Sequence, residues 1–357
     1  MKLIEASKHT WKWRLGTAAL AVAAVTGVWQ LIRSLRGDFR WDLFLATFLR
    51  LDPGWLATSI GLALVTYLGR AVRWRVLIRA QKENPSLWRL FVATSIGFTA
   101  IVLFGRPGEM VRPYLIGVKE KLSFSSQMGA WLLERMYDLM MALFIFGFAL
   151  SQVRSSGLEV GERMNWVLQA GGYFVVGVGA VCMVVFGALR QFGERSKRRI
   201  LDGLGFLPAT YHHKAEELLN AFTQGVQSTR SWGAVVEILF WSITEWLLIV
   251  GCYYSLFRAS LDLGKFGLMD ILIFVGFTAF GSVVQIPGVG GGTQLVTMAV
   301  LTELFGVPLE IATGMAVILW AVTFVVIVPL GLLLAFHEGI RWRSLRHLEE
   351  TIEQPGP

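Results

Sequence analysis

Long apolar segments are the feature that most restricts what this chain can fold into. Nine of them occur, near 15–32, 55–69, 88–104, 128–150, 165–189, 233–257, 268–286, 293–305 and 311–336. A helix that crosses a membrane needs about 20 mainly apolar residues, and several segments reach that length. Charged residues make up only 16% of the 357 residues, whereas soluble domains carry about 25%. The segments do not show the alternation of a membrane β-barrel, so the sequence predicts an all-α, polytopic helical membrane protein.

Two of the shorter segments end in helix-breaking residues. Segment 88–104 is followed by Gly-Arg-Pro-Gly and segment 268–286 by Pro-Gly, and both contain the tetrapeptide GFTA. Non-helical backbone at membrane depth occurs where protein buries it or where it lines a wet cavity. Paired broken helices of opposite sense are a sequence signal for a transporter binding site near the midplane. We interpret both segments as re-entrant elements.

The distribution of Lys and Arg favours this topology, because basic residues gather in cytoplasmic loops. With two re-entrant elements and a cytoplasmic N-terminus, 22 of the 33 basic residues lie inside and 8 outside. If both segments contribute full crossings instead, the numbers become 17 and 15. We therefore predict about six full crossings plus two oppositely oriented re-entrant elements, with both termini cytoplasmic.

The domain prediction is a single integral membrane domain over 1–340. Within it, 190–232 is expected to be a cytoplasmic amphipathic linker, and 341–357 to be a short cytoplasmic tail. The start of the chain is expected to form an uncleaved first helix, because its apolar run continues past a short signal-peptide core. The net charge of +8 fits loops that face anionic lipid, so we expect membrane lipids as partners and no nucleic acid.

Three charges surround the first break. Arg106, Glu109 and Arg112 are spaced three apart, which on a helix places them on one face. Pro107 suits the first turn of a helix, and the free N–H groups of a helix N-terminus together with an arginine form an anion site. The guanidinium fork of arginine also matches a phosphate.

Three further charges, Glu134, Arg135 and Asp138, lie inside the next apolar segment. Charges at membrane depth are costly and normally face a bundle interior or a wet cavity, where they pair. With the three charges at the first break, they form a set of six residues with no net charge. One interpretation is that the charges pair and lock two segments together. The other is that at least one arginine contacts a lipid headgroup, and the two roles can coexist.

The second break, IPGVGGGTQ, offers Gln285, Thr293 and Gln294 beside a glycine-rich backbone. It lacks the Gly-Lys-Ser/Thr ending of a phosphate loop, which argues against a nucleotide site. The alternatives are a flexible break between half-helices or backbone amides that face polar ligand atoms. The five histidines lack metal-ligand spacing, so no metal and no cofactor is predicted.

The string GRAVRWRVLIRA places Arg70 and Arg73 beside Trp74. An aromatic residue with arginines that reach toward the headgroups is typical of a membrane interface. We expect these three residues to anchor the chain there or to contact acidic headgroups.

The order of the motifs resembles a known family. The strings RAVRW at 70–74, GRPGEMVRPYLI at 105–116, ERMYD at 134–138 and IPGVGGGTQ at 286–294 are similar to the membrane region of lysylphosphatidylglycerol synthases, a flippase-like integral membrane family. Members of that family often carry a glutamate after the last glycines, where this chain has Thr293 and Gln294.

The resemblance implies a role in the bacterial inner membrane: translocation of a phospholipid or a related anionic or aminoacylated lipid. Only a short tail follows the last apolar segment, so the aminoacyl-transferase reaction of larger relatives is not expected. The alternative is a membrane enzyme or accessory subunit in isoprenoid, hopanoid or glycan-lipid biosynthesis, with a lipid-synthesis enzyme as partner.

Overall fold

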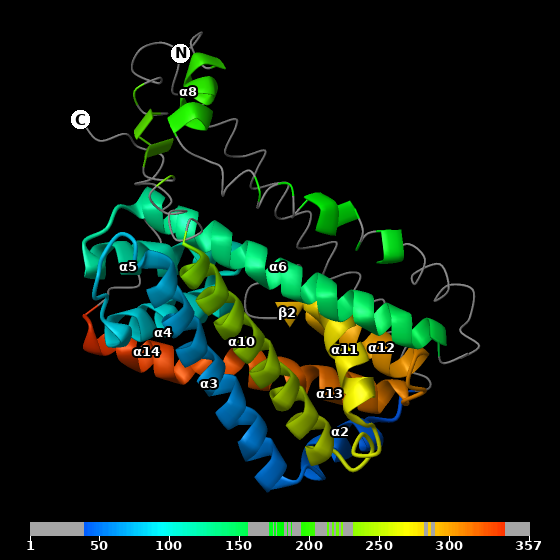
Figure 1. Ribbon diagram of the computed structural model, residues 1–357. Coiled ribbons are helices and arrows are strands. Elements are labelled where there is room, and N and C mark those ends of the chain that lie inside the picture. The colour runs from blue at the N-terminus through cyan, green and yellow to red at the C-terminus, as the bar shows by residue number, and fades with distance from the viewer. Residues whose placement is uncertain are drawn as a thin grey trace, which may run out of the picture.

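The computed structural model describes residues 39–155, 231–281, 285–286 and 290–339, with shorter stretches between 171 and 223. Its elements in chain order are α2 (Trp41–Leu49), α3 (Pro53–Ile78), α4 (Leu87–Phe104), the 3-10 helix η1 (Arg106–Met110), α5 (Val111–Glu120), α6 (Phe124–Ser155), α8 (Glu194–Gly203), α10 (Trp232–Ala259), α11 (Leu268–Gly281), strands β1 (Gln285–Ile286) and β2 (Gly290–Gly291), α12 (Gly292–Glu303), α13 (Leu309–Trp320), the π-helical turn η3 (Ala321–Val325) and α14 (Ile327–His337) (Figure 1).

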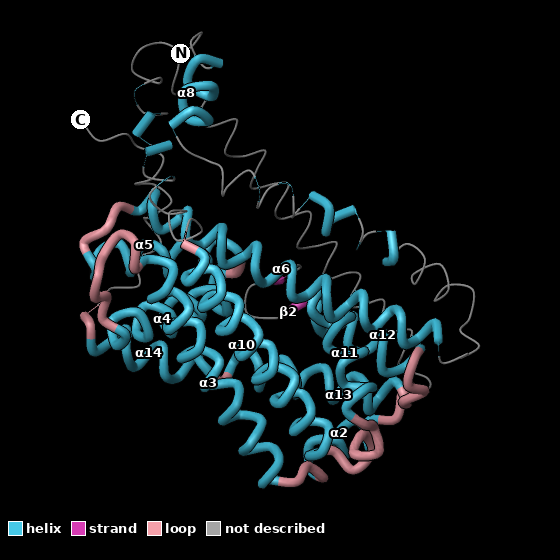
Figure 2. The backbone as a smooth tube through the Cα atoms, in the orientation of Figure 1, coloured by secondary structure: helices cyan, strands magenta, loops and turns pink. Residues whose placement is uncertain are grey.

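The predicted helical membrane class is confirmed. Within the part of the chain that the structure describes, four helical runs are long and apolar enough to cross a membrane, and α13, η3 and α14 together form one of them: Pro53–Ile78, Leu87–Phe104, Trp232–Ala259 and Leu309–His337. Figure 2 shows that helix makes up most of the described backbone, with short loops such as the one between α3 and α4. The predictions for 15–32 and 341–357, and most of those for 165–189 and 190–232, fall outside the described residues.

Helices α3 and α10 form a long antiparallel pair, visible side by side in Figure 1. Asp52 caps α3, since its Oδ1 accepts a hydrogen bond from the backbone N–H of Trp55 at 2.9 Å. The backbone N–H of Asp52 donates to the carbonyl of Ala259 at 2.8 Å, which joins the start of α3 to the end of α10. Helix α3 continues to Ile78, nine residues beyond the expected end of the apolar segment at 69.

The first break produces a helical hairpin of α4, η1 and α5. Gly105, with φ of 72°, ends α4 in a conformation that favours glycine. A Cβ on Gly97 would lie 2.5 Å from Cβ of Arg112, so α4 and α5 approach closely. At the open end of the hairpin, Arg89 Nη1 donates to the carbonyl of Lys119 at 3.3 Å. The start of α4 and the end of α5 therefore lie together.

The second break produces another hairpin. Its two arms are α11 and α12, which pack against each other, and its connection contains the antiparallel strands β1 and β2. Phe266, just before α11, stacks on Phe305, just after α12, with ring centroids 4.7 Å apart. The start of α11 and the end of α12 therefore lie together at the open end of this hairpin.

The molecule has two chemically different ends. The basic end, defined by Arg79, Lys82, Arg89 and Lys119, joins the open side of the first hairpin to the end of α3, the start of α10 and the end of α14 through ion pairs. The acidic end is defined by Asp52, Asp262, Glu303 and Glu310, and it contains the open side of the second hairpin.

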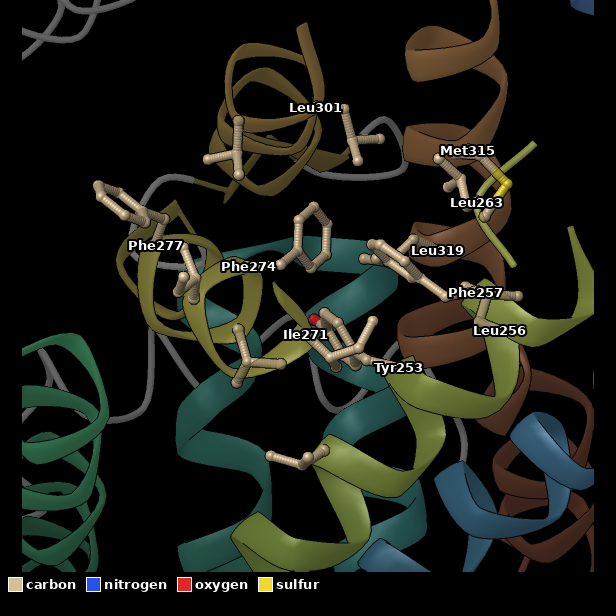
Figure 3. Packing of buried hydrophobic residues seen from close by; sticks show 14 of the residues in the cluster. Tyr253, Leu256, Phe257, Leu263, Ile271, Phe274, Phe277, Leu301, Met315 and Leu319 are labelled. Carbon is tan, nitrogen blue, oxygen red and sulfur yellow. The ribbon is translucent and has the colours of Figure 1, made fainter. Parts of the chain in front are cut away.

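Two apolar clusters fill the interior. One surrounds Trp74 and Leu133 and packs the first hairpin against α3 and α6. The other lies toward the acidic end, where the Phe274 ring on α11 contacts Phe257 and Tyr253 of α10 (Figure 3). Polar residues collect between these clusters.

Candidate functional site

A cavity of about 300 Å³ lies among α3, α4, α6, α10, α11, the start of α12 and the η3 turn. Its polar and charged lining comprises Thr66, Tyr67, Arg70, Arg135, Asp138, Glu245, Cys252, Tyr253, Thr278, Thr293 and Thr323. The η3 turn takes part in one of its hydrogen bonds, because the Tyr67 hydroxyl donates to the carbonyl of Thr323 at 3.0 Å. π-Helical turns often occur at functional sites.

Arg73 is the central member of an ionic network behind this cavity, and its side chain is fully buried. Its Nη1 donates to Asp138 Oδ1 at 2.6 Å and lies 3.3 Å from Glu245 Oε2. Its Nη2 lies 2.9 Å from Glu134 Oε1. One arginine on α3 therefore joins carboxylates from α6 and α10, which lie far apart in the sequence.

Glu134 is the second branching point. Its carboxylate pairs with Arg112 of the first hairpin and with Arg135, at 3.3 Å, in addition to Arg73. The Arg112 guanidinium lies over the Trp74 ring, 4.1 Å from the centroid, an arrangement that stabilises a cation away from water. Arg112 is 4% exposed as a side chain and Glu134 is not exposed at all.

Four members of the network line the cavity within the described chain: Arg70, Arg135, Asp138 and Glu245. The side chains of Arg70, Arg135 and Asp138 are 16%, 37% and 18% exposed. Arg70 Nη2 pairs with Glu245 Oε1 at 2.7 Å, and Arg135 Nη2 pairs with Asp138 Oδ2 at 3.0 Å. Arg70 also lies over the ring of Phe98, 4.8 Å from its centroid.

The network has an excess positive charge. Among the described residues, these ion pairs connect four arginines to three carboxylates: Arg70, Arg73, Arg112 and Arg135 to Glu134, Asp138 and Glu245. Burying ions without full compensation is costly, so such an excess calls for a physical reason.

The network lies deep within the helices. At a rise of 1.5 Å per residue, Glu134 is about 15 Å along α6 from Phe124. By the same rise, Glu245 is about 20 Å along α10 from Trp232. Both helices begin at the basic end, and a hydrocarbon core is about 30 Å thick. The charges therefore lie in the interior of the helical bundle, well away from its basic end.

The sequence also matches a known protein family. Residues 16–331 match the family model described as "Lysylphosphatidylglycerol synthase TM region". The chain belongs to this family. Searches of curated proteins and of solved structures found no match. Family and apolar helices together make it a multi-pass membrane protein with a lipid-related function.

Several of the site residues predicted from the sequence come together. Arg112, Glu134, Arg135 and Asp138 belong to the ionic network, and Thr293 lines the cavity.

Other predicted residues lie elsewhere or have a local role. Gln294 Oε1 accepts a hydrogen bond from the backbone N–H of Gly291 at 2.6 Å, which caps α12. Arg106 and Glu109 lie in the 3-10 helix η1, and Gln285 lies in β1. The side chains of Arg106 and Gln285 are outside the described part of the structure.

Two predictions need correction. Arg73 and Trp74 were expected at a membrane interface, but both side chains are fully buried, and Trp74 Nε1 donates to Gln127 Oε1 at 3.1 Å. The reason is that α3 continues for another turn and more beyond them, so this part of the helix is interior. Four residues of the predicted neutral group, Arg112, Glu134, Arg135 and Asp138, belong to the network, and Arg70, Arg73 and Glu245 join them.

The sequence interpretation missed Glu245. This residue is buried on α10 and pairs with both Arg70 and Arg73. The signal was present, because a carboxylate in the middle of the apolar segment 233–257 is an intramembrane charge that needs a partner.

Proposed function

We propose that this protein translocates a phospholipid across the bacterial inner membrane. The observation that carries the proposal is the ionic network in the interior of the helical bundle, in direct contact with a cavity. Intramembrane ionisable residues normally mark a pathway for a polar group. A phospholipid headgroup is such a group, and the apolar part of the cavity wall suits its chains.

The two hairpins support a transport mechanism. The first is open toward the basic end and the second toward the acidic end. We infer that both are re-entrant in the membrane, entering from opposite sides. Broken helices in opposite orientation flank the binding site in many secondary transporters, which alternate access by moving one element against another.

The two ends support an orientation. Arg75, Arg79, Lys82, Arg89, Lys119 and Lys121 are the basic residues at or near the basic end within the described chain, whereas Arg40, Arg50, Arg258 and Lys265 are those of the opposite end. Because basic residues favour the cytoplasm, the basic end is the cytoplasmic one in this proposal, as expected from the full sequence.

The test is transport of fluorescent phospholipids in vesicles that contain the purified full-length protein, with a membrane-impermeant quencher to report the leaflet. Wild-type protein should accelerate translocation over empty vesicles. Arg112→Ala should lose most of that acceleration, because it removes the arginine that joins the first hairpin to Glu134.

The matched control is Arg79→Ala, which removes a half-exposed arginine paired with Glu237 and should transport normally. Size-exclusion profiles establish that each variant is folded. If Arg112→Ala does not fold, Arg112→Lys, which keeps the positive charge, takes its place. Equal rates for wild type and a folded Arg112→Ala protein would contradict the assigned site. No acceleration by wild type for any phospholipid would contradict translocation itself.

A further inference from the structure

We propose that the cavity selects lipids whose headgroup carries one phosphodiester and no amine, such as phosphatidylglycerol. This inference rests on the proposed function and narrows its substrate class. It follows from the charges of the network, from the two arginines that reach the cavity and from the pairing of the acidic residues that line it.

The first step is the charge of the network. Four arginines face three carboxylates within the described chain. Arg106 and Glu109, on the neighbouring turn η1, have opposite formal charges and leave the excess unchanged. An uncompensated charge in a low-dielectric interior is unfavourable. A ligand with a single negative charge makes the occupied site neutral.

The second step is the position of the donors. Arg70 and Arg135 reach the cavity from α3 and α6, and each uses Nη2 for its carboxylate. A guanidinium has five N–H donors. Both side chains line the cavity and are partly exposed, at 16% for Arg70 and 37% for Arg135. Two arginine forks on facing helices can therefore hold the non-bridging oxygens of one phosphate.

The third step excludes an amine. Asp138 and Glu245 are the carboxylates in the described cavity lining. Arg73 lies 2.6 Å from Asp138 and 3.3 Å from Glu245, and Arg70 lies 2.7 Å from Glu245. An ammonium group would have to displace an arginine from one of them. A zwitterionic headgroup also leaves the excess charge uncompensated, and a cationic aminoacyl headgroup increases it.

The rest of the cavity wall combines neutral polar groups with a large apolar part, which suits the glycerol backbone and the start of an acyl chain. It is formed by residues that include Ala63, Leu139, Ala142, Ile249, Val275 and Phe324. The ligand is therefore a lipid rather than a free phosphate ester.

The experiment measures lipid retention by native mass spectrometry on the full-length protein. The protein is titrated with equimolar phosphatidylglycerol, phosphatidylethanolamine and lysyl-phosphatidylglycerol of identical chains. Wild type should retain phosphatidylglycerol over either competitor by at least about tenfold, the ratio that one fully satisfied additional interaction supports. Equal or preferential retention of an amine-bearing lipid would overturn the inference. In a separate arm, displacement of phosphatidylglycerol by an equal concentration of glycerol phosphate would show a site for soluble phosphate esters and would also overturn it.

Charge variants test the cause of the selectivity. Arg135→Gln makes the network neutral, so the ratio should fall close to one, whereas Arg135→Lys should keep the preference. Glu245→Gln raises the excess to two charges and should shift retention toward phosphatidic acid, whose phosphomonoester carries more charge. Asp138→Asn makes the same change in charge if Glu245→Gln does not fold. An unchanged ratio in folded Arg135→Gln contradicts the proposal.

The matched control, Arg79→Gln, removes a basic residue of the surface and should not alter the ratio. The transport assay separates the two proposals. If vesicles show translocation of phosphatidylethanolamine and phosphatidylglycerol at equal rates, the selectivity fails and translocation stands. If phosphatidylglycerol is retained selectively but is not moved, binding stands and translocation fails.

Discussion

The two helical hairpins have the same architecture, because each consists of two helices joined at a break. They differ in the side chains that they contribute to the site. The first supplies Arg112 to the ionic network, and at its open end Arg89 of α4 donates to the carbonyl of Lys119 of α5 at 3.3 Å. The second supplies Thr293 to the cavity and is closed at its open end by the stacked rings of Phe266 and Phe305.

This difference shows that one hairpin provides charged groups to the site region and the other provides neutral ones. The charged hairpin is held by groups that water can solvate at its open end and by arginine–carboxylate pairs near its tip. The second hairpin has a glycine-rich tip and contributes neutral polar groups, so it can line the site without changing its charge. In the proposed site, Arg70 of α3 and Arg135 of α6 hold the anion, and Thr293 of the second hairpin lines the same cavity without adding charge.

The largest effect is expected for Glu134→Gln. This change removes the carboxylate that pairs with Arg73, Arg112 and Arg135, and loss of one partner from a buried ion pair typically costs about 3–5 kcal/mol. We expect a large loss of unfolding free energy, measured in mixed micelles of a mild detergent and a denaturing one.

Glu237→Gln is the matched control for this variant. Glu237 pairs with Arg79 at 2.9 Å, but the two side chains are 35% and 51% exposed. Exposed pairs contribute about 0–1 kcal/mol. If both glutamine variants unfolded at the same denaturant concentration as wild type, the buried network would not be what fixes the first hairpin.

How much the sequence predicts depends on what determines each feature. Both breaks could be found because Gly and Pro act locally. The charged residues of α6 could be found because a charge in an apolar segment is itself the signal. Glu245 carried the same signal and was overlooked. Which residues become partners depends on how the helices pack, so its pairing with Arg70 and Arg73 of α3 could not be predicted.

The error at Arg73 and Trp74 has a similar cause. The pattern of arginines around a tryptophan is the same at a membrane interface and inside a bundle. Only the continuation of α3 to Ile78 and the carboxylates of α6 and α10 distinguish the two. A local pattern therefore identified the right residues and assigned the wrong surroundings.

An intermediate effect is expected from one glycine-to-alanine substitution in each hairpin, Gly108→Ala in the first and Gly276→Ala in the second. A Cβ on Gly108 would collide with the backbone of Ala100 and lie 2.6 Å from the backbone N of Ile101, so α4 itself would have to move. A Cβ on Gly276 of α11 would lie 3.0 Å from Cβ of Ala149 on α6, a contact that small shifts relieve. Overpacking costs about 1–3 kcal/mol, and we expect Gly108→Ala at the upper part of that range and Gly276→Ala near its lower limit.

Unfolding of the two variants in parallel measures this difference between the hairpins. Gly61→Ala on α3 is the control, because a Cβ there meets nothing within 4 Å, and alanine gains up to about 1 kcal/mol over glycine in a helix. A greater loss for Gly276→Ala than for Gly108→Ala would mean that the second hairpin, with its glycine-rich tip, is the more tightly fixed of the two.

The smallest effect is expected for Glu338→Gln, at the open end of the first hairpin. Lys119 Nζ lies 2.6 Å from Glu338 Oε2, and these side chains are 15% and 32% exposed, so the pair joins α5 to the end of α14 close to solvent. Because salt screens exposed pairs, its contribution should be below about 1 kcal/mol and should decrease as salt increases. Unfolding at low and high salt should therefore show a small difference from wild type at low salt that vanishes at high salt. The loss caused by Glu134→Gln should persist under both conditions, because that carboxylate is fully buried. If the two losses responded to salt alike, the network would be open to solvent and could not hold an uncompensated charge for a lipid.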